Sequence, residues 1–236
     1  MQTKPLLKKG LAIGIILLFI GTAIIPSTAQ NIEKSSSRGN WLYVGGSGPG
    51  NYTRIQDAIN ASYNGDTVFV YDDSSPYVEN IFVNVSISLV GEEKNTTIID
   101  GAGNGSGITI NANNVTILGF TIQNYRNGAA IFLTSNNSYI SDNIITKCIS
   151  GIYLASSHNR IIRNVISKCD DGTQLYGTDN YYGGNKIMEC FFAFDIDSFN
   201  TTIERNSIVK NIFGFQQEKG ADHIYFIENN FINKKL

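Results

Sequence analysis

The residues best suited to chemistry are five acidic side chains in the second half of the chain, Asp170, Asp171, Asp195, Asp197 and Glu218. On a β-strand, Asp195 and Asp197 would project from one face about 7 Å apart, which lies in the range that inverting glycosidases use for their acid and base. Acids separated by one residue are also common on ordinary surfaces. If the chain is an enzyme, we expect Asp171, Asp195 and Asp197 to be catalytic; otherwise we expect no catalytic residue.

Aromatic side chains occur on the same predicted strand face. The expected outward positions are Phe132, Tyr153, Gln174, Asp195 and Gln216, followed two residues later by Thr134, Ala155, Tyr176, Asp197 and Glu218. Exposed aromatic rings beside polar groups suit sugar stacking and hydrogen bonding. The alternative is an ordinary solvated sheet face. The candidate ligand-binding surface consists of Phe132, Tyr153, Tyr176, Asp195 and Asp197.

Three cysteines, Cys148, Cys169 and Cys190, are spaced by 21 residues. Stacked thiols can hold a soft metal such as copper, but we expect the cysteines to act as small apolar side chains that fill the same position in successive coils. Three cysteines cannot all pair, so at least one thiol stays free or bonds to another chain. His158 and His223 are too far apart along the chain to share an ion. We predict no metal and no cofactor, with the cysteines as the weak candidates for metal ligands.

The element that must position these residues is a repeat. Asparagines recur every 21 residues, each two residues before an isoleucine and eight before a glycine or alanine, at Asn143, Asn164, Asn185 and Asn206. A fixed period of this length is typical of repeat architectures, in which each repeat buries its apolar face against its neighbours.

Within each repeat, apolar and polar residues alternate with the period of a strand. About three short strands per coil of about 21 residues predict a parallel β-helix of about eight or nine coils. We expect the asparagines to form a structural ladder at the bends, because asparagine tolerates the left-handed conformation and stacked amides can bond to one another. We expect the small residues Ala130, Gly151, Gly172, Ala193 and Gly214 to mark a second bend.

The N-terminus has the features of a secretory signal. Basic residues precede the apolar run Leu11–Ile25, and Ser27-Thr28-Ala29 supplies small residues at a cleavage site. We therefore predict a signal peptide over 1–29, a linker over 30–40 and a secreted, periplasmic or cell-surface protein. The alternative is an uncleaved membrane anchor.

The composition excludes one class of partner. The chain has 18 basic and 20 acidic residues, and the predicted signal contains three of the lysines, so the remainder carries 15 basic residues and a net charge of −5. No basic patch remains that could bind nucleic acid. The low charged fraction of 16% and the abundance of Asn, Ser, Thr and Gly favour a β-rich exported domain.

The start of the domain, 41–66, is predicted to cap the first coil. Trp41–Val44 has a strand pattern, and Thr53 with Gln56 three residues later fits a capping box that opens a short helix over 54–62. Regular repeats follow over about 114–236. The final coil, with Phe226 and Phe231, shows no cap in its sequence, so we expect a second copy, a partner protein or the chain's own tail to cover it.

Four segments carry a resemblance to a known fold: Tyr52–Asn60, Gly65–Val70, Ile87–Gly91 and Thr97–Gly101. They resemble right-handed β-helix proteins of the pectin-lyase-like superfamily. The Asn-x-Ile and Gly-Ile-x-Leu repeats are similar to the NosD-type periplasmic β-helix, also called the carbohydrate-binding and sugar-hydrolase module. Over 41–236, the resemblance implies an all-β, single-stranded right-handed parallel β-helix with a short N-terminal capping helix.

The resemblance is weaker for function. The Gly-His-Gly and Arg-x-Lys elements of pectinase-type hydrolases are absent, as is the Ala-Arg-Asp element of pectin methylesterases. We therefore expect an exported or cell-surface repeat protein, non-catalytic, that binds a polysaccharide, a glycoprotein or a partner protein. The alternatives are a polysaccharide hydrolase or lyase that uses the acidic cluster and, as the NosD name implies, a copper-handling accessory protein.

Overall fold

The computed structural model describes residues 39–232. The predicted signal peptide, 1–29, and all but the last two residues of the predicted linker lie outside the described residues. Within 39–232, none of the helices combines the length and the apolar character required to cross a membrane.

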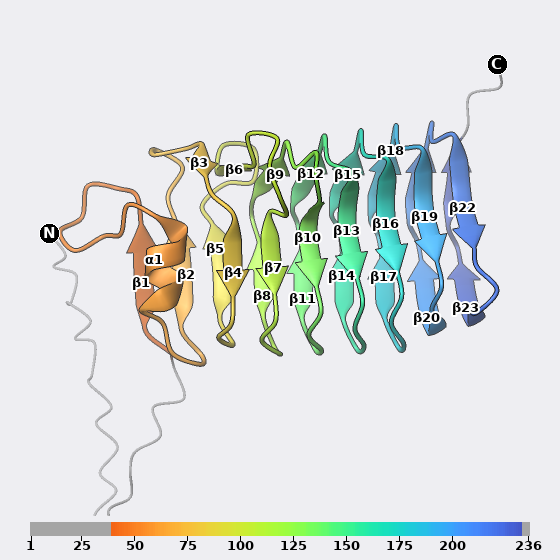
Figure 1. Cartoon of the computed structure of the whole chain (residues 1–236), viewed down its shortest axis with the longest axis horizontal. Helices are drawn as coiled ribbons and strands as arrows, with labels where there is room; N and C mark the ends of the chain where they lie inside the picture. Colours follow the sequence, from red (N-terminus) through yellow and green to blue (C-terminus); the bar gives the residue numbers. More distant parts are fainter. Residues whose placement is uncertain (1–38, 233–236) are drawn as a thin grey trace, which may run out of the picture. The chain divides into compact units, whose positions relative to one another are not determined.

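Three parallel sheets form the walls of a solenoid, and each strand pairs with the equivalent strand one coil away (Figure 1). The nine-stranded sheet contains β1 (Trp41–Val44), β2 (Thr67–Val70), β5 (Ser88–Gly91), β8 (Thr116–Leu118), β11 (Tyr139–Ser141), β14 (Arg160–Ile162), β17 (Tyr181–Gly183), β20 (Phe199–Glu204) and β23 (Asp222–Ile227). The seven-stranded sheet contains β4 (Ile81–Val83), β7 (Ile108–Ile110), β10 (Ala129–Leu133), β13 (Ser150–Leu154), β16 (Asp171–Leu175), β19 (Phe192–Ile196) and β22 (Phe213–Gln217). The eight-stranded sheet contains β3 (Tyr77–Val78), β6 (Ile98–Asp100), β9 (Thr121–Gln123), β12 (Ile144–Thr146), β15 (Val165–Ser167), β18 (Lys186–Met188), β21 (Ser207–Val209) and β24 (Asn230–Ile232).

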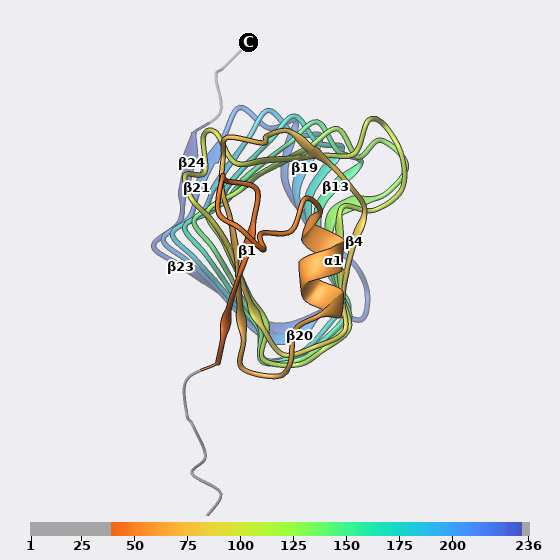
Figure 2. The same ribbon diagram turned by 90° about the vertical axis from the view of Figure 1, so that its left-hand side faces the viewer.

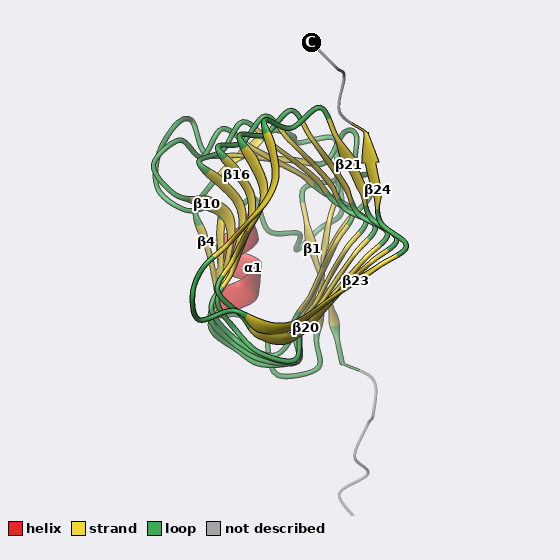
Figure 3. Cartoon of the chain, turned by 90° about the vertical axis from the view of Figure 1, so that its right-hand side faces the viewer, coloured by secondary structure: helices red, strands yellow, loops and turns green. Residues whose placement is uncertain are grey.

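The register of the strands follows the 21-residue period. Ile145 pairs with Ile166, Ile166 with Ile187, and Ile187 with Ile208. The chain visits the three sheets in turn, as the end view in Figure 3 shows. The predicted parallel β-helix with three strands per coil is therefore confirmed.

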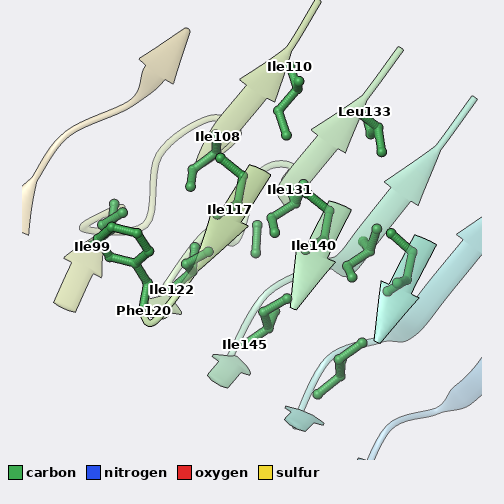
Figure 4. Close-up of a cluster of buried hydrophobic side chains, with 14 of the residues drawn as sticks. Ile99, Ile108, Ile110, Ile117, Phe120, Ile122, Ile131, Leu133, Ile140 and Ile145 are labelled. Atoms are coloured by element: carbon green, nitrogen blue, oxygen red, sulfur yellow. The ribbon is translucent and has the colours of Figure 1, made fainter. Parts of the chain in front are cut away.

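The interior of the solenoid is a continuous apolar core. Inward side chains of successive coils stack in columns, for example Ile117 and Ile140 (Figure 4). Ile161 continues this column, and all three side chains are fully buried. Burying each such side chain contributes about 1.5–3 kcal/mol relative to leaving it exposed. Because each coil covers the previous one, no coil could bury this surface alone.

The asparagine ladder exists, but its conformation differs from the prediction. The left-handed residue at this bend is the one immediately before each asparagine, with φ between 51° and 62°: Asp142, Arg163, Gly184, Arg205 and Glu228. The asparagines themselves are buried, and their side chains bridge coils. Asn164 Oδ1 accepts hydrogen bonds from the backbone and side-chain amides of Asn143 at 3.0 and 3.1 Å, and Asn185 does the same for Asn164 at 2.9 and 3.2 Å. Asparagine is required here for its amide, not for its backbone freedom.

A second ladder at another bend was not predicted. The backbone amide of Ser138 donates to Asn159 Oδ1 at 2.8 Å, and that of Asn159 donates to Asn180 Oδ1 at 2.9 Å. Only two asparagines occupy this column, which is too few to reveal a period in the sequence.

The prediction that the column of small residues marks a bend is wrong. Gly151 and Gly172 lie inside the strands β13 and β16. A Cβ atom on Gly151 would lie 2.4 Å from the Gly172 carbonyl oxygen and 2.6 Å from Ile166 Cγ2. The small residues are explained by close packing between coils and not by a turn.

The first coil carries the helix α1 (Ile55–Asn60), which buries Ile55, Ala58 and Ile59 and lies at the N-terminal end of the solenoid in Figure 2. The predicted capping box is wrong: the N-cap residue is Arg54, and no side chain at that position caps the helix. Instead the buried Glu79 carboxylate accepts the amides of Ile55 and Gln56 at 2.8 and 3.1 Å. The Glu79 carboxylate thus supplies the cap that the local sequence pattern had assigned to the Thr53 side chain.

Candidate functional site

The candidate surface lies on the outer face of the seven-stranded sheet, over β10, β13, β16 and β19. Pairing places Phe132 beside Tyr153, Tyr153 beside Gln174, and Gln174 beside Asp195. Alternate residues on these strands point inward, which turns this column toward solvent. Four of the five predicted surface residues, Phe132, Tyr153, Tyr176 and Asp195, come together here.

Three aromatic rings form a stack along this face. The rings of Phe132 and Tyr153 are 4.8 Å apart and nearly parallel, at 20°. The rings of Tyr153 and Tyr176 are 5.1 Å apart and tilted by 39°. Tyr176 comes from just beyond β16, and its ring crosses toward Tyr153 from the neighbouring column. It ends the stack and is 36% exposed.

Polar groups adjoin the Tyr176 end of the stack. The Tyr176 hydroxyl donates a hydrogen bond to Asp195 Oδ2 at 3.2 Å, and Gln174 Nε2 donates to the Tyr176 hydroxyl at 3.4 Å. Burial and the Asp195 carboxylate raise the pKa of Tyr176 to about 12, so the hydroxyl stays a donor. Asp195 is half-buried, and its Oδ1 is buried and has no hydrogen-bond partner within the described chain.

The carboxyl group that interacts with Asp195 is Asp171, one coil earlier. Burial, followed by the charges of Asp195 and Asp170, raises the pKa of Asp171 above its ordinary value. Asp197 lies just beyond the end of β19, is exposed, and sits beside the turn at Gly220. The electrostatic coupling between Asp171 and Asp195 depends on stacking of coils, so it cannot be read from the spacing of Asp195 and Asp197.

The raised pKa of Asp171 has a consequence for stability. The folded protein keeps this proton at pH values where the unfolded chain, with a pKa near 3.8, has lost it, so the free energy of unfolding falls as pH rises through this window. We expect Asp171→Asn to be more stable than wild type at neutral pH and to lose part of this pH dependence. Thermal unfolding measured from about pH 3 to 7 checks this, with the exposed Asp197→Asn as the control. An unchanged pH profile in Asp171→Asn would contradict it.

The cysteine column is buried just after β12, β15 and β18, and all three thiols are free. Each sulfur lies 3.2–3.5 Å from the backbone carbonyl oxygen two residues earlier, to which the thiol donates. The neighbouring thiols of Cys148 and Cys190, together with burial, raise the pKa of the central thiol, Cys169. These contacts favour the prediction that the cysteines fill core positions.

The two histidines lie at different sites. His158 Nε2 is 3.7 Å from Asp179, and His223 Nδ1 is 3.0 Å from Asp222. Across residues 39–232, no group of three or more His, Cys, Asp or Glu side chains is arranged to hold a metal ion.

The last described coil exposes several apolar side chains: Phe213, Phe215, Phe226, Phe231 and Ile232. The expectation that a second copy or a partner protein covers this coil stays a prediction, and analytical ultracentrifugation of Phe231→Asp beside the wild type would address it.

Comparisons with known proteins agree on the fold. A family model described as periplasmic copper-binding protein (NosD) matches residues 59–235. The crystal structure of Escherichia coli YbhC is similar with a TM-score of 0.57 and 9% identity, covering 89% of this chain and 87% of that one. Pectin methylesterase PemA from Erwinia chrysanthemi is similar with a TM-score of 0.47 and 12% identity, covering 83% and 90%. No curated protein matches the sequence. At 9% identity, the similarity to YbhC shows the fold alone.

Proposed function

This chain belongs to the NosD family of periplasmic proteins, and from that premise we propose that it is an exported β-helix that binds neutral glycans without cleaving them. The proposed binding surface is the outer face of the seven-stranded sheet around Phe132, Tyr153 and Tyr176. A family described as periplasmic fits an exported protein.

The observation that carries this proposal is the aromatic stack that ends in a hydrogen-bonded polar group. The tilt of Tyr176 leaves part of its ring exposed for contact with the C–H face of a sugar. Gln174 can donate to and Asp195 can accept from sugar hydroxyls beside that ring. The carboxyl groups of Asp171 and Asp195 disfavour a negatively charged ligand, so neutral glycans are expected to bind better than polyuronates.

Calorimetry and array binding with a panel of neutral and acidic oligosaccharides test this proposal. We expect Tyr176→Ala, which removes the exposed ring, to weaken binding at least about tenfold, and Tyr153→Ala, which removes its support, to weaken it as well. Tyr63→Ala is the matched control, because Tyr63 is 76% exposed and lies outside this surface. Stoichiometry and affinity that stay at the wild-type values in both Tyr153→Ala and Tyr176→Ala would exclude this face as a binding site.

A second candidate function is glycan hydrolysis, favoured by the two carboxyl groups with different environments. Asp171, with its raised pKa, suits a general acid, whereas Asp195, which accepts a hydrogen bond from Tyr176, suits a carboxylate base. The same oligosaccharide mixtures, assayed for new reducing ends, separate the candidates. Release of reducing ends that disappears in Asp195→Asn would show that the protein is an enzyme and not solely a binding module.

The family description also names copper, whose protein ligands are mainly His, Cys and Met. The described residues do not fit such a site. They contain no suitable group of three or more His, Cys, Asp or Glu side chains, and the buried thiols already donate to backbone carbonyl groups.

A further inference from the structure

We infer that the first coil carries a separate saccharide site, in the cavity between the glycine-rich loop 45–51 and the aromatic rings of Tyr43 and Tyr71. It shares with the proposed function only the class of ligand, a neutral sugar. It lies on the outside of the nine-stranded sheet. It uses none of the residues of the proposed binding surface around Phe132, Tyr153 and Tyr176.

Four aromatic side chains gather on this part of the sheet. In the pairing of β1 with β2, Tyr43 lies beside Phe69, while Val44 and Val70 point into the core. Trp41 and Tyr71 extend the group, and neighbouring ring centroids are 5.1–6.3 Å apart. Trp41 is 56% exposed and Tyr43 is 38% exposed. These rings form an apolar platform that faces solvent, which is unusual for so many large aromatic groups.

A cavity of about 510 Å³ adjoins this platform. Its aromatic walls are Tyr43 and Tyr71, and its polar lining includes Ser47, Asn51 and Asp73 beside the glycines of the loop. The volume falls within the range of about 300–1,000 Å³ typical of small-molecule sites. The combination of aromatic walls and converging polar groups distinguishes this cavity from a merely apolar patch.

The loop that lines the cavity is held in place by hydrogen bonds. Asn51 Nδ2 donates to the Gly45 carbonyl at 2.6 Å, and the Gly46 amide donates to Asp73 Oδ1 at 2.9 Å. The Gly45 amide donates to the Tyr52 carbonyl at 2.8 Å. Gly46 has a left-handed φ of 69°, and a Cβ atom on it would lie 2.8 Å from the Tyr71 ring. A larger residue would fill the space against Tyr71, so the glycine keeps a preformed cavity open.

The lining favours a sugar over other ligands. Tyrosine rings can cover the C–H face of a pyranose, while a carboxylate, an amide and a hydroxyl match its hydroxyl groups. The residues that line the cavity include one acid, Asp73, and no basic side chain. A phosphate or carboxylate ligand would therefore meet repulsion, and a neutral sugar would not.

The experiment measures stoichiometry and affinity for neutral oligosaccharides by calorimetry, with the full chain. In wild type we expect binding to the cavity that Tyr43→Ala weakens at least about tenfold, while Tyr43→Phe retains most of it because the ring remains. Asp73→Asn keeps an oxygen that can accept the Gly46 amide, so it tests the carboxylate without removing the loop contact. Thermal unfolding of each variant verifies folding.

The two sites are distinguished by pairing these variants with Tyr176→Ala. If Tyr43→Ala abolishes binding and Tyr176→Ala leaves it intact, the result would support the cavity site even if the proposed surface around Tyr176 does not bind. A stoichiometry of two sites in wild type that falls to one site in each variant would support both the cavity site and the surface around Tyr176. Wild type that binds no neutral oligosaccharide, or folded Tyr43→Ala and Asp73→Asn proteins with wild-type stoichiometry and affinity, would overturn the inference.

Discussion

Replacing Asn164 with leucine is expected to destabilise the protein by about 3–6 kcal/mol, because several buried polar groups lose a hydrogen-bond partner at once. The Asn164 side chain accepts the Asn143 amide at 3.0 Å and donates to the Ile140 carbonyl at 2.9 Å. It also bonds to the next asparagine of the ladder, Asn185. Leucine fills a similar volume but satisfies none of these groups. Urea and thermal unfolding measure the change.

The matched control for this substitution is Asn127→Leu, since Asn127 is exposed at a loop. A surface change of this kind is expected to alter stability by less than about 0.5 kcal/mol. Because stability in a solenoid is a sum over coils and their interfaces, Asn164→Leu is also expected to lower cooperativity and to open the central coils first. Hydrogen exchange localises that opening. Equal stability of the Asn164→Leu and Asn127→Leu proteins would show that the ladder does not hold the coils together.

Replacing Gly177 with alanine is expected to cost about 3 kcal/mol, at the upper end for overpacked sites, because the added atom meets backbone. A Cβ atom built on Gly177 would lie 1.6 Å from the Ser156 carbonyl oxygen of the preceding coil. No side-chain rotation can relieve that overlap, so the two coils must separate locally. Gly177 directly follows Tyr176, so the shift is also expected to disturb the hydrogen bond between Tyr176 and Asp195.

Gly103→Ala provides the comparison for Gly177→Ala. Gly103 has a left-handed φ of 88°, and a Cβ atom added to it would meet no other atom. Alanine there is therefore expected to destabilise the protein only through its unfavourable backbone conformation, by about 1–2 kcal/mol. We therefore expect a clearly lower melting temperature for Gly177→Ala than for Gly103→Ala. The reverse order would mean that the close approach of Gly177 to Ser156 does not exist in solution.

The architecture could be predicted from the sequence because it repeats. Each coil must place an apolar residue over an apolar residue and an amide over an amide, so the same physical requirement is written several times at a spacing of 21 residues. Ile145, Ile166 and Ile187 pair as this period requires. The role of the small residues could not be predicted, since a glycine pattern alone does not separate a turn from a close approach inside a strand.

The helix cap was missed for a different reason. Thr53 and Gln56 form a favourable local pattern, but the carboxylate of Glu79 reaches the helix amides from a segment more than twenty residues away. Contacts of this kind occur once and leave no period in the sequence. The aromatic cavity of the first coil was missed likewise, although the alternation of Trp41 with Tyr43 and of Phe69 with Tyr71 is a signal that could have identified its walls.

By itself, the sequence determined that the chain winds into a parallel β-helix whose strands stack in register, and it identified the column containing Phe132, Tyr153 and Asp195. Only the tertiary structure decided that Tyr176 crosses into that column, that the charge of Asp195 raises the pKa of Asp171, and that the loop at Gly46 lines a cavity. The reason is physical. Stacking repeats one set of contacts in every coil, whereas each site depends on single contacts between particular side chains of different coils.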